Sequence, residues 1–192
     1  MAIRKVLDIG GNIGQFATSV LALNPELERI DVFEPNPEIF DTLEKNLSGL
    51  DRVRCFNFGI GPNGPAQFHF TPGYSVVGSI LSENAKHREA SALSSIEVQL
   101  ISDISSVTGN SAYDLVKIDV EGFEYEVVEA IRGLSFRYLY IEFTGRAKEK
   151  SHATSELHAM LRERFGPYEV LYQAAGNRES TIIETLLEFV GE

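Results

Sequence analysis

The segment KVLDIGGNIG, residues 5–14, decides the fold of this chain. Its first five residues are mostly apolar, which predicts a short strand buried in a sheet. Three glycines then predict a tight turn, because glycine adopts backbone angles that other residues avoid. A helix is expected over residues 15–23, ended by Pro25. A buried strand, a glycine-rich turn and a helix in this order are typical of an α/β fold with a ligand at the turn.

Strand-like and helix-like stretches alternate along much of the remaining chain. Apolar runs predict strands, and apolar residues at helical spacing predict the helices between them. The expected strands after the first are residues 29–33, 52–58, 113–118 and 137–143, with a hairpin-like pair at 169–172 and 180–190. The expected helices after the first are residues 37–47, 123–131 and 151–165. This alternation predicts a parallel sheet covered by helices, and hence an α/β sandwich.

The middle of the chain has a weaker pattern. Residues 66–70 (AQFHF) and 96–101 are expected to be strands, and residues 102–107 a short helical turn. Residues 71–95 hold glycine, serine and charged residues without firm periodicity, so we expect a loop or a short helix there. Since no linker or repeat interrupts the sequence, residues 1–192 are predicted to form a single domain.

The charge balance narrows the choice of partners. The chain has 17 basic and 28 acidic residues, which give a net charge of −11. Such a charge disfavours nonspecific attraction to nucleic acid or to an anionic membrane surface, and it mildly favours a neutral or cationic small molecule. We therefore expect no nucleic-acid partner and no membrane association.

The single cysteine and the N-terminal sequence both bear on the cellular compartment of the protein. Cys55 is the only cysteine in the sequence, so no intramolecular disulfide can form. The N-terminus lacks an apolar segment long enough for a signal peptide, and no stretch approaches the roughly 20 apolar residues of a spanning helix. The sequence therefore predicts a soluble protein in a reducing, cytoplasmic setting.

The glycine turn differs from two familiar phosphate-binding motifs. A dinucleotide fingerprint ending at Gly14 would need glycine at position 9, where the chain has Ile9. The sequence also contains no P-loop motif. A nicotinamide-dependent oxidoreductase is therefore a less favoured alternative, and a P-loop hydrolase is disfavoured.

Two acidic residues stand where a nucleoside would need them. Asp8, at the end of the first strand, can accept a hydrogen bond from a cationic or amino group. Glu34 lies twenty residues after Gly14, at the end of the second strand, where its carboxylate is positioned to bind both ribose hydroxyls of an adenosine. The glycines alone are also typical of an ordinary αβ turn, and Glu34 alone of an exposed acid at a strand end, but the glycines and Glu34 at this spacing favour a nucleoside site.

A second polar group follows the strand at residues 113–118. Lys117 interrupts that apolar strand, and because an unpaired buried charge is costly, we expect a carboxylate as its partner. Asp119 and Glu121 come directly after it, at the sheet edge where α/β folds bind ligands. They could orient a cofactor, bind a substrate or take up its proton. Alternatively, Asp119 caps the next helix, and Glu121 and Glu124 favour its positive end.

These segments together resemble the FkbM-like family of S-adenosylmethionine-dependent methyltransferases over most of the chain. The family's D-x-G-x-N-x-G turn matches residues 8–14, its E-P-N-P segment residues 34–37, and its K-I-D-V-E-G segment residues 117–122. A weaker match falls at residues 141–143. The resemblance implies a Rossmann-like methyltransferase fold, with a mostly parallel seven-stranded sheet, helices on both faces and an antiparallel strand near the C-terminus.

The resemblance also implies a cofactor and its site. The cofactor is S-adenosylmethionine, and members of the family generally transfer its methyl group to an oxygen of a small molecule or sugar. Here the glycine turn would line the methionine end and the ribose, Glu34 would bind the ribose, and residues 58–60 would border the adenine. The implied cofactor-binding residues are Asp8, Gly10, Asn12, Gly14, Glu34, Pro35, Phe58, Gly59, Ile60 and Asp119. A looser match places Ser79 near the pocket.

The expected mechanism is in-line displacement at the methyl group, promoted mainly by holding the acceptor oxygen against it. Asp119 and Glu121 are the candidate catalytic residues. His69 is a further candidate for taking the proton, although a solvated strand histidine is its favoured interpretation. No metal is expected; the alternative is a divalent ion held by Asp119, Glu121 and Glu142.

The start of the chain bears on how the acceptor is covered. Many members of the family carry N-terminal structure that helps to cover the substrate, whereas this chain begins almost at the first strand. The cover could come from a second subunit, which leaves a homo-oligomer open, from residues 71–95, or from no part of this chain. A non-catalytic nucleoside-binding or scaffold domain is the alternative of a different class, and its mark would be cofactor binding without turnover.

Overall fold

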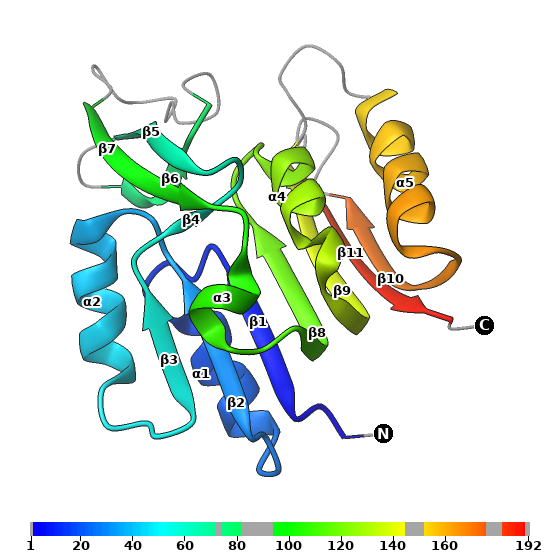
Figure 1. The fold of residues 1–192 in the computed structure, drawn as a ribbon, viewed down its shortest axis with the longest axis horizontal. Coiled ribbons are helices and arrows are strands. Elements are labelled where there is room, and N and C mark those ends of the chain that lie inside the picture. Colours follow the sequence, from blue (N-terminus) through cyan, green and yellow to red (C-terminus); the bar gives the residue numbers. More distant parts are fainter. Residues whose placement is uncertain (1, 72–73, 82–93, 145–151, 176–181, 191–192) are drawn as a thin grey trace.

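The computed structural model describes residues 2–71, 74–81, 94–144, 152–175 and 182–190. Within these residues, seven strands form one sheet in the order β10-β11-β9-β8-β1-β2-β3 (Figure 1). Its strands are β1 (Lys5–Ile9), β2 (Arg29–Phe33), β3 (Val53–Phe56), β8 (Ala112–Asp119), β9 (Ser135–Thr144), β10 (Tyr168–Ala175) and β11 (Ile182–Phe189). β11 runs antiparallel to β9 and β10, and all other neighbours are parallel. The expected mostly parallel sheet with one antiparallel strand is confirmed.

Helices cover both faces of this sheet, as expected. α1 (Gln15–Leu23) and α2 (Pro37–Leu47) share one buried apolar cluster with β1 and β2. On the opposite face, α3 (Ile104–Thr108), α4 (Glu124–Ala130), the 3-10 turn Ile131–Gly133 and α5 (His152–Phe165) share a second cluster with β1, β8 and β9. Among the described helices, none combines the length and the apolar character that crossing a bilayer requires.

A second, smaller sheet lies beyond the carboxyl ends of the parallel strands (Figure 1). In the described residues its order is β4-β7-β5-β6, with β4 at Gly59–Ile60, β5 at Gly64–Thr71, β6 at Tyr74–Ser79 and β7 at Ser94–Ile101. A separate cluster of apolar side chains, centred on Phe68, Val98 and Leu100, holds this sheet together. We call these four strands the small sheet.

The small sheet corrects the expectation for residues 71–95. Residues 74–79 form β6, a strand that pairs antiparallel with β5, rather than a loop or a short helix. The reason is tertiary, because residues 74–79 become a strand by pairing with the edge of β5, and their local sequence does not indicate that pairing. Residues 72–73 and 82–93 lie outside the described part of the chain.

The third strand is also shorter than the predicted residues 52–58. β3 ends at Phe56, and the chain then leaves the main sheet to begin β4 at Gly59. The side-chain amide of Asn57 donates to the carbonyl oxygens of Glu34 and Pro35, at 2.8 and 3.1 Å. These bonds tie the departing chain to the end of β2.

The glycine turn after β1 is fixed between two strands. The amide groups of Gly10 and Gly11 both donate to the Phe33 carbonyl oxygen, at 3.0 and 2.9 Å. Gly10 has a φ of +82°, and a Cβ on it would lie 1.8 Å from the carbonyl oxygen of Asp119. The turn can therefore lie against the end of β8 only because position 10 has no side chain.

We predict that Gly10→Ala lowers the free energy of unfolding by more than about 3 kcal/mol or prevents folding, because steric overlap adds to backbone strain. Gly49→Ala is the matched control, since Gly49 has a φ of +78° but no atom within 4 Å of an added Cβ. It should cost only the roughly 1–2 kcal/mol of the left-handed backbone. Urea unfolding measures both variants, and equal losses would show that contact with β8 does not constrain the turn.

Candidate functional site

A cavity of about 550 Å³ lies at the carboxyl ends of β1, β2 and β8, beneath the small sheet. Nine of the residues singled out in the sequence line it together, from four separate segments of the chain. They are Gly10, Asn12, Glu34, Pro35, Phe58, Gly59, Ile60, Asp119 and Glu121. The fold therefore collects the glycine turn, the E-P-N-P segment and the K-I-D-V-E-G segment around one space.

Two of the expected cofactor residues lie outside the cavity lining. Asp8 is fully buried on β1, behind the turn. Gly14 stands at the N-cap of α1 with a φ of +92°, and a Cβ there would contact Leu43 and Leu47 at 3.1 Å. In this structure Asp8 and Gly14 support the turn from behind.

Glu34 holds a buried carboxyl group at the end of β2. One of its oxygens accepts the Asn12 amide at 3.0 Å and the other accepts the Asn36 amide at 2.9 Å. Burial raises the pKa of Glu34 to about 7, although these two backbone hydrogen bonds act to lower it. Each ionised carboxylate oxygen can accept two hydrogen bonds, so both oxygens retain capacity for a ligand.

Lys117 is the buried cation of the site. Its ammonium group donates to the Gly10 carbonyl oxygen at 2.6 Å and lies 3.2 Å from Asp8 and 3.4 Å from Asp119. Burial acts to lower the pKa of Lys117, but the two carboxylates outweigh it, so the pKa lies above its usual value. The prediction that a carboxylate would pair with Lys117 is confirmed.

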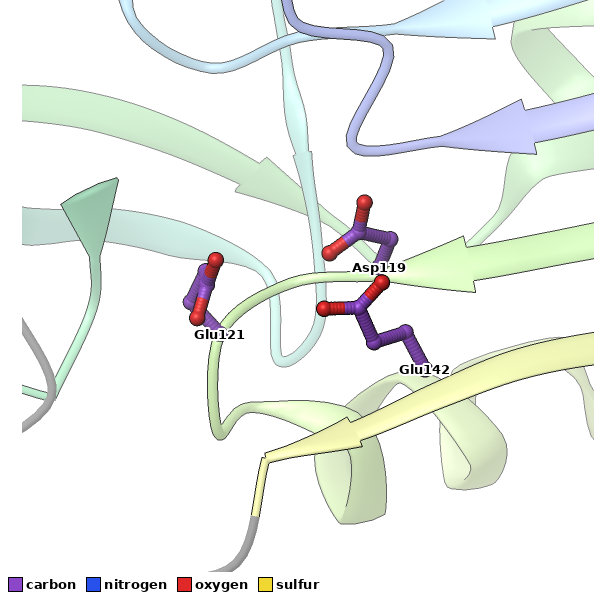
Figure 2. A group of neighbouring side chains, drawn as sticks. All are labelled: Asp119, Glu121 and Glu142. Atoms are coloured by element: carbon purple, nitrogen blue, oxygen red, sulfur yellow. The ribbon is translucent and has the colours of Figure 1, made fainter. Parts of the chain in front are cut away.

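Three carboxylates gather beside the cavity. Figure 2 shows Asp119 at the end of β8, Glu121 on the loop that follows and Glu142 on the neighbouring strand β9. One oxygen from each lies within 4.8 Å of the others, which is an arrangement of hard ligands that a divalent cation could accept. The expectation of a metal-free site stays a prediction.

Glu121 is held in an unusual backbone conformation. Its φ is +50°, in the left-handed region that non-glycine residues seldom adopt. Thr144 donates from its hydroxyl to the Glu121 carboxylate at 3.3 Å. Burial, followed by the charges of Asp119 and Glu142, raises the pKa of Glu121 to about 7.

The alternative that Asp119 caps the next helix is wrong. The N-cap of α4 is Phe123, and no side chain makes a capping hydrogen bond there. Asp119 pairs with Lys117 instead. Glu124 does serve the helix start, since its carboxylate accepts the Gly122 amide at 2.7 Å.

The sequence did not identify the side chains that cover the cavity. Phe68 and Phe70 line it from β5, while His69, which lies between them on the strand, is absent from the lining. The alternation in AQFHF predicted a strand whose odd and even residues face opposite ways, but it could not tell which face meets a ligand. The remaining contributions of the small sheet come from Thr71, Gly78, Ile80, Ser94 and Leu100.

A family model described as a methyltransferase FkbM domain matches residues 8–168. This chain belongs to that family. The FkbM match contains all three segments that line the cavity. The likeness to solved methyltransferase structures also confirms the expected Rossmann-like methyltransferase fold.

Two curated relatives of this FkbM domain are similar over much of its length. The 2-O-methyltransferase NoeI of Sinorhizobium fredii is 31% identical over 154 residues, which cover 72% of this chain and 63% of NoeI. The methyltransferase sdnD of Sordaria araneosa is 27% identical over 155 residues, covering 66% of this chain and 60% of sdnD. The chain thus spans less than two thirds of the length of either relative.

A solved structure shares the fold. The methyltransferase FkbM of Methylobacillus flagellatus superposes with a TM-score of 0.63 at 15% identity, covering 98% of this chain and 44% of that one. The structure of TrmK from M. capricolum, in complex with S-adenosylhomocysteine, superposes with a TM-score of 0.52 at 11% identity, covering 97% of this chain and 62% of that one. At these identities the likeness concerns the fold.

The acids of this FkbM domain give its stability a definite pH dependence. Burial raises the pKa of Glu124 to about 8, from an ordinary value of 4.5. Between these values the folded chain keeps a proton that the unfolded chain has released, so the stability contributed by this group falls as pH rises from 4.5 to about 8. Glu34, Glu121 and Glu142 act in the same direction, each with a pKa of about 7.

We predict that Glu124→Gln stabilises the protein at pH 8.5 by about 2 kcal/mol or more, since a pKa shift of one unit corresponds to about 1.4 kcal/mol. The amide oxygen can still accept from Gly122, and the gain should shrink to nearly zero close to pH 4.5. Urea unfolding across this pH range measures the effect. Glu44→Gln, at an exposed position on α2, is the control and should show no such trend. A gain in stability that does not depend on pH would contradict the conclusion that Glu124 stays protonated in the folded protein.

Proposed function

We propose that this domain transfers the methyl group of S-adenosylmethionine to a hydroxyl oxygen of a small-molecule or sugar acceptor. The observation that carries the proposal is the placement of Glu34. Its carboxyl group lines the cavity at the end of β2 and retains acceptor capacity beyond the amides of Asn12 and Asn36. A vicinal diol such as ribose suits two adjacent carboxylate oxygens.

The remainder of the cavity fits the same cofactor. Its volume of about 550 Å³ falls in the usual range for small-molecule sites. Gly10 and Asn12 adjoin Glu34 and are proposed to contact the methionine and ribose parts. Pro35 and residues 58–60 form the wall proposed for the adenine. When bound, S-adenosylmethionine supplies an activated methyl group on a positively charged sulfur, and transfer leaves S-adenosylhomocysteine.

The acceptor hydroxyl must lose its proton as its oxygen bonds to the methyl carbon. Glu121 lines the cavity, and its pKa of about 7 suits a group that takes up a proton near neutral pH. Asp119 also lines the cavity, but its carboxylate is already paired with Lys117 at 3.4 Å. We therefore assign Glu121 to the proton and Asp119 to orienting the cofactor's amino group, with no metal required.

The relatives and the charge of the chain support the acceptor class. NoeI carries the name of a 2-O-methyltransferase, which favours a hydroxyl acceptor for this chain as well. The net charge of −11 favours a neutral or cationic acceptor over a nucleic acid. A reducing, cytoplasmic location fits the single cysteine, and a homo-oligomer that completes the cover of the site belongs to the same proposal.

Thermal unfolding with and without ligand tests the cofactor. S-adenosylmethionine or S-adenosylhomocysteine at about 100 times its dissociation constant should raise the melting temperature by about 5–11 °C, and NAD or NADH should not. A rise with the nicotinamide cofactors alone would favour an oxidoreductase instead. Binding without turnover on any hydroxylated acceptor would favour a non-catalytic nucleoside-binding domain.

Glu34→Gln should weaken S-adenosylhomocysteine binding by about tenfold or more, because charge-assisted hydrogen bonds contribute about 1.5–3 kcal/mol. Isothermal titration calorimetry measures the change. The control is Glu44→Gln, which removes a negative charge from an exposed position on α2 and should bind like the parent. Equal affinities of the parent and Glu34→Gln would contradict the proposal that Glu34 binds the ribose.

Glu121→Gln should lower the rate of methyl transfer by about 100-fold or more and leave the affinity for S-adenosylhomocysteine within about twofold. In the parent, the rate should rise with pH up to about 7, because Glu121 takes the proton only when ionised. Single-turnover rates between pH 5.5 and 9, measured for both proteins, test this. A variant that keeps the parental rate and pH profile would show that Glu121 is not the base.

A further inference from the structure

The small sheet spans the cavity from one wall to the other. At one edge, β4 carries Gly59 and Ile60, which border the proposed adenine end. At the opposite edge, β6 ends at Ser79, whose hydroxyl donates to the carbonyl oxygen of Glu121 at 2.7 Å. The small sheet therefore roofs the space between the proposed cofactor site and the candidate base.

The underside of this roof is apolar. Phe68 and Phe70 lie two residues apart on β5, so their side chains face the same way, and both line the cavity. Ile80 joins them from the end of β6, and Phe123 adds a third ring from the loop before α4. Gly78 allows the close approach of β6, since a Cβ there would lie 2.6 Å from the Phe68 ring.

Polar and apolar side chains line different parts of the roofed space. The carboxylates of Asp119 and Glu121 line one part of it and are able to accept hydrogen bonds from hydroxyl groups. The rings of Phe68 and Phe70 stand above, with the hydroxyl-bearing Thr71 and Ser94 also in the lining. A purely polar acceptor would leave these rings against water, whereas an apolar group on the acceptor would cover them.

We propose that the acceptor is amphiphilic, with its reacting hydroxyl beside Glu121 and an attached apolar group packed beneath the small sheet against Phe68, Phe70 and Ile80. This inference rests on the proposed function, because methyl transfer is what places the reacting oxygen near Glu121. The apolar group supplies binding energy at a distance from the reacting oxygen, while the hydroxyl end is selected by the carboxylates.

A neutral apolar fluorophore, N-phenyl-1-naphthylamine, tests the apolar space directly. With S-adenosylhomocysteine at saturation, the dye should bind the parent protein with enhanced fluorescence. Phe70→Ala should weaken dye binding by about tenfold, because it removes one whole ring from the contact. Val98→Ala is the matched control, since Val98 belongs to the same apolar cluster but does not line the cavity, and it should bind the dye like the parent.

Competition then tests the amphiphile. Octyl β-glucoside, below its micelle concentration, should displace the dye, and methyl β-glucoside at the same concentration should not. Displacement by both glucosides, or by neither, would overturn the proposal. So would equal weakening of dye binding in the two alanine variants, since that would report a general loosening of the small sheet.

The thermal shift with S-adenosylhomocysteine reports cofactor binding independently of the dye. If S-adenosylhomocysteine binds but expels the dye, the apolar space belongs to the cofactor, and the acceptor proposal alone is overturned. If S-adenosylhomocysteine binds and the dye binds neither with nor without it, the acceptor proposal alone is again overturned. If S-adenosylhomocysteine itself does not bind, the proposed function fails and the acceptor proposal falls with it.

Discussion

One buried ammonium group joins the parts of the site. Lys117 on β8 contacts the carboxylate of Asp8 on β1, the carbonyl oxygen of Gly10 in the turn and the carboxylate of Asp119 facing the cavity. Buried ion clusters add little to stability, and apolar replacements are often at least as stable. This cluster is therefore better explained by geometry, because it fixes the glycine turn and an anionic side chain in one arrangement.

The parts of the fold that the sequence predicts well are those determined by neighbouring residues. The bounds of β1, α1, β2 and α2 match the expected ranges residue for residue, because apolar periodicity, the glycine turn, Pro25 and Pro37 all act locally. The partner of Lys117 was predictable for a similar reason, since a charge in a central strand requires a counter-charge. The placement of the glycine turn and Glu34 at one cavity followed from the rule that ligands lie at the carboxyl ends of parallel strands, whereas Asn12 and Pro35 were implied by the family resemblance.

The parts that the sequence could not predict depend on distant pairing. β6 forms because β5 offers it an edge, and neither strand carries a pattern that identifies its partner. The same limit applies to the surroundings of Asp8. Its burial and its contact with Lys117 depend on the adjacent strand β8, and the local sequence does not specify which residue lies opposite on that strand. The capping role expected as an alternative for Asp119 failed for the same reason.

The hydrogen bond from Ser79 to the Glu121 carbonyl has a consequence for how such domains diversify. The small sheet is inserted between β3 and α3, so its strands can change without altering the glycine turn or Glu34. An insert that differs in β5, β6 and β7 but keeps β4, which forms part of the proposed adenine wall, would alter the shape of the roof while the proposed cofactor half stays intact. The insert is not fully independent, however, because its Ser79 hydroxyl contacts the backbone of Glu121, a residue with a φ of +50°. An insert that keeps a hydroxyl at position 79 can retain this contact, so the proposed acceptor pocket can vary in shape while its link to Glu121 is preserved.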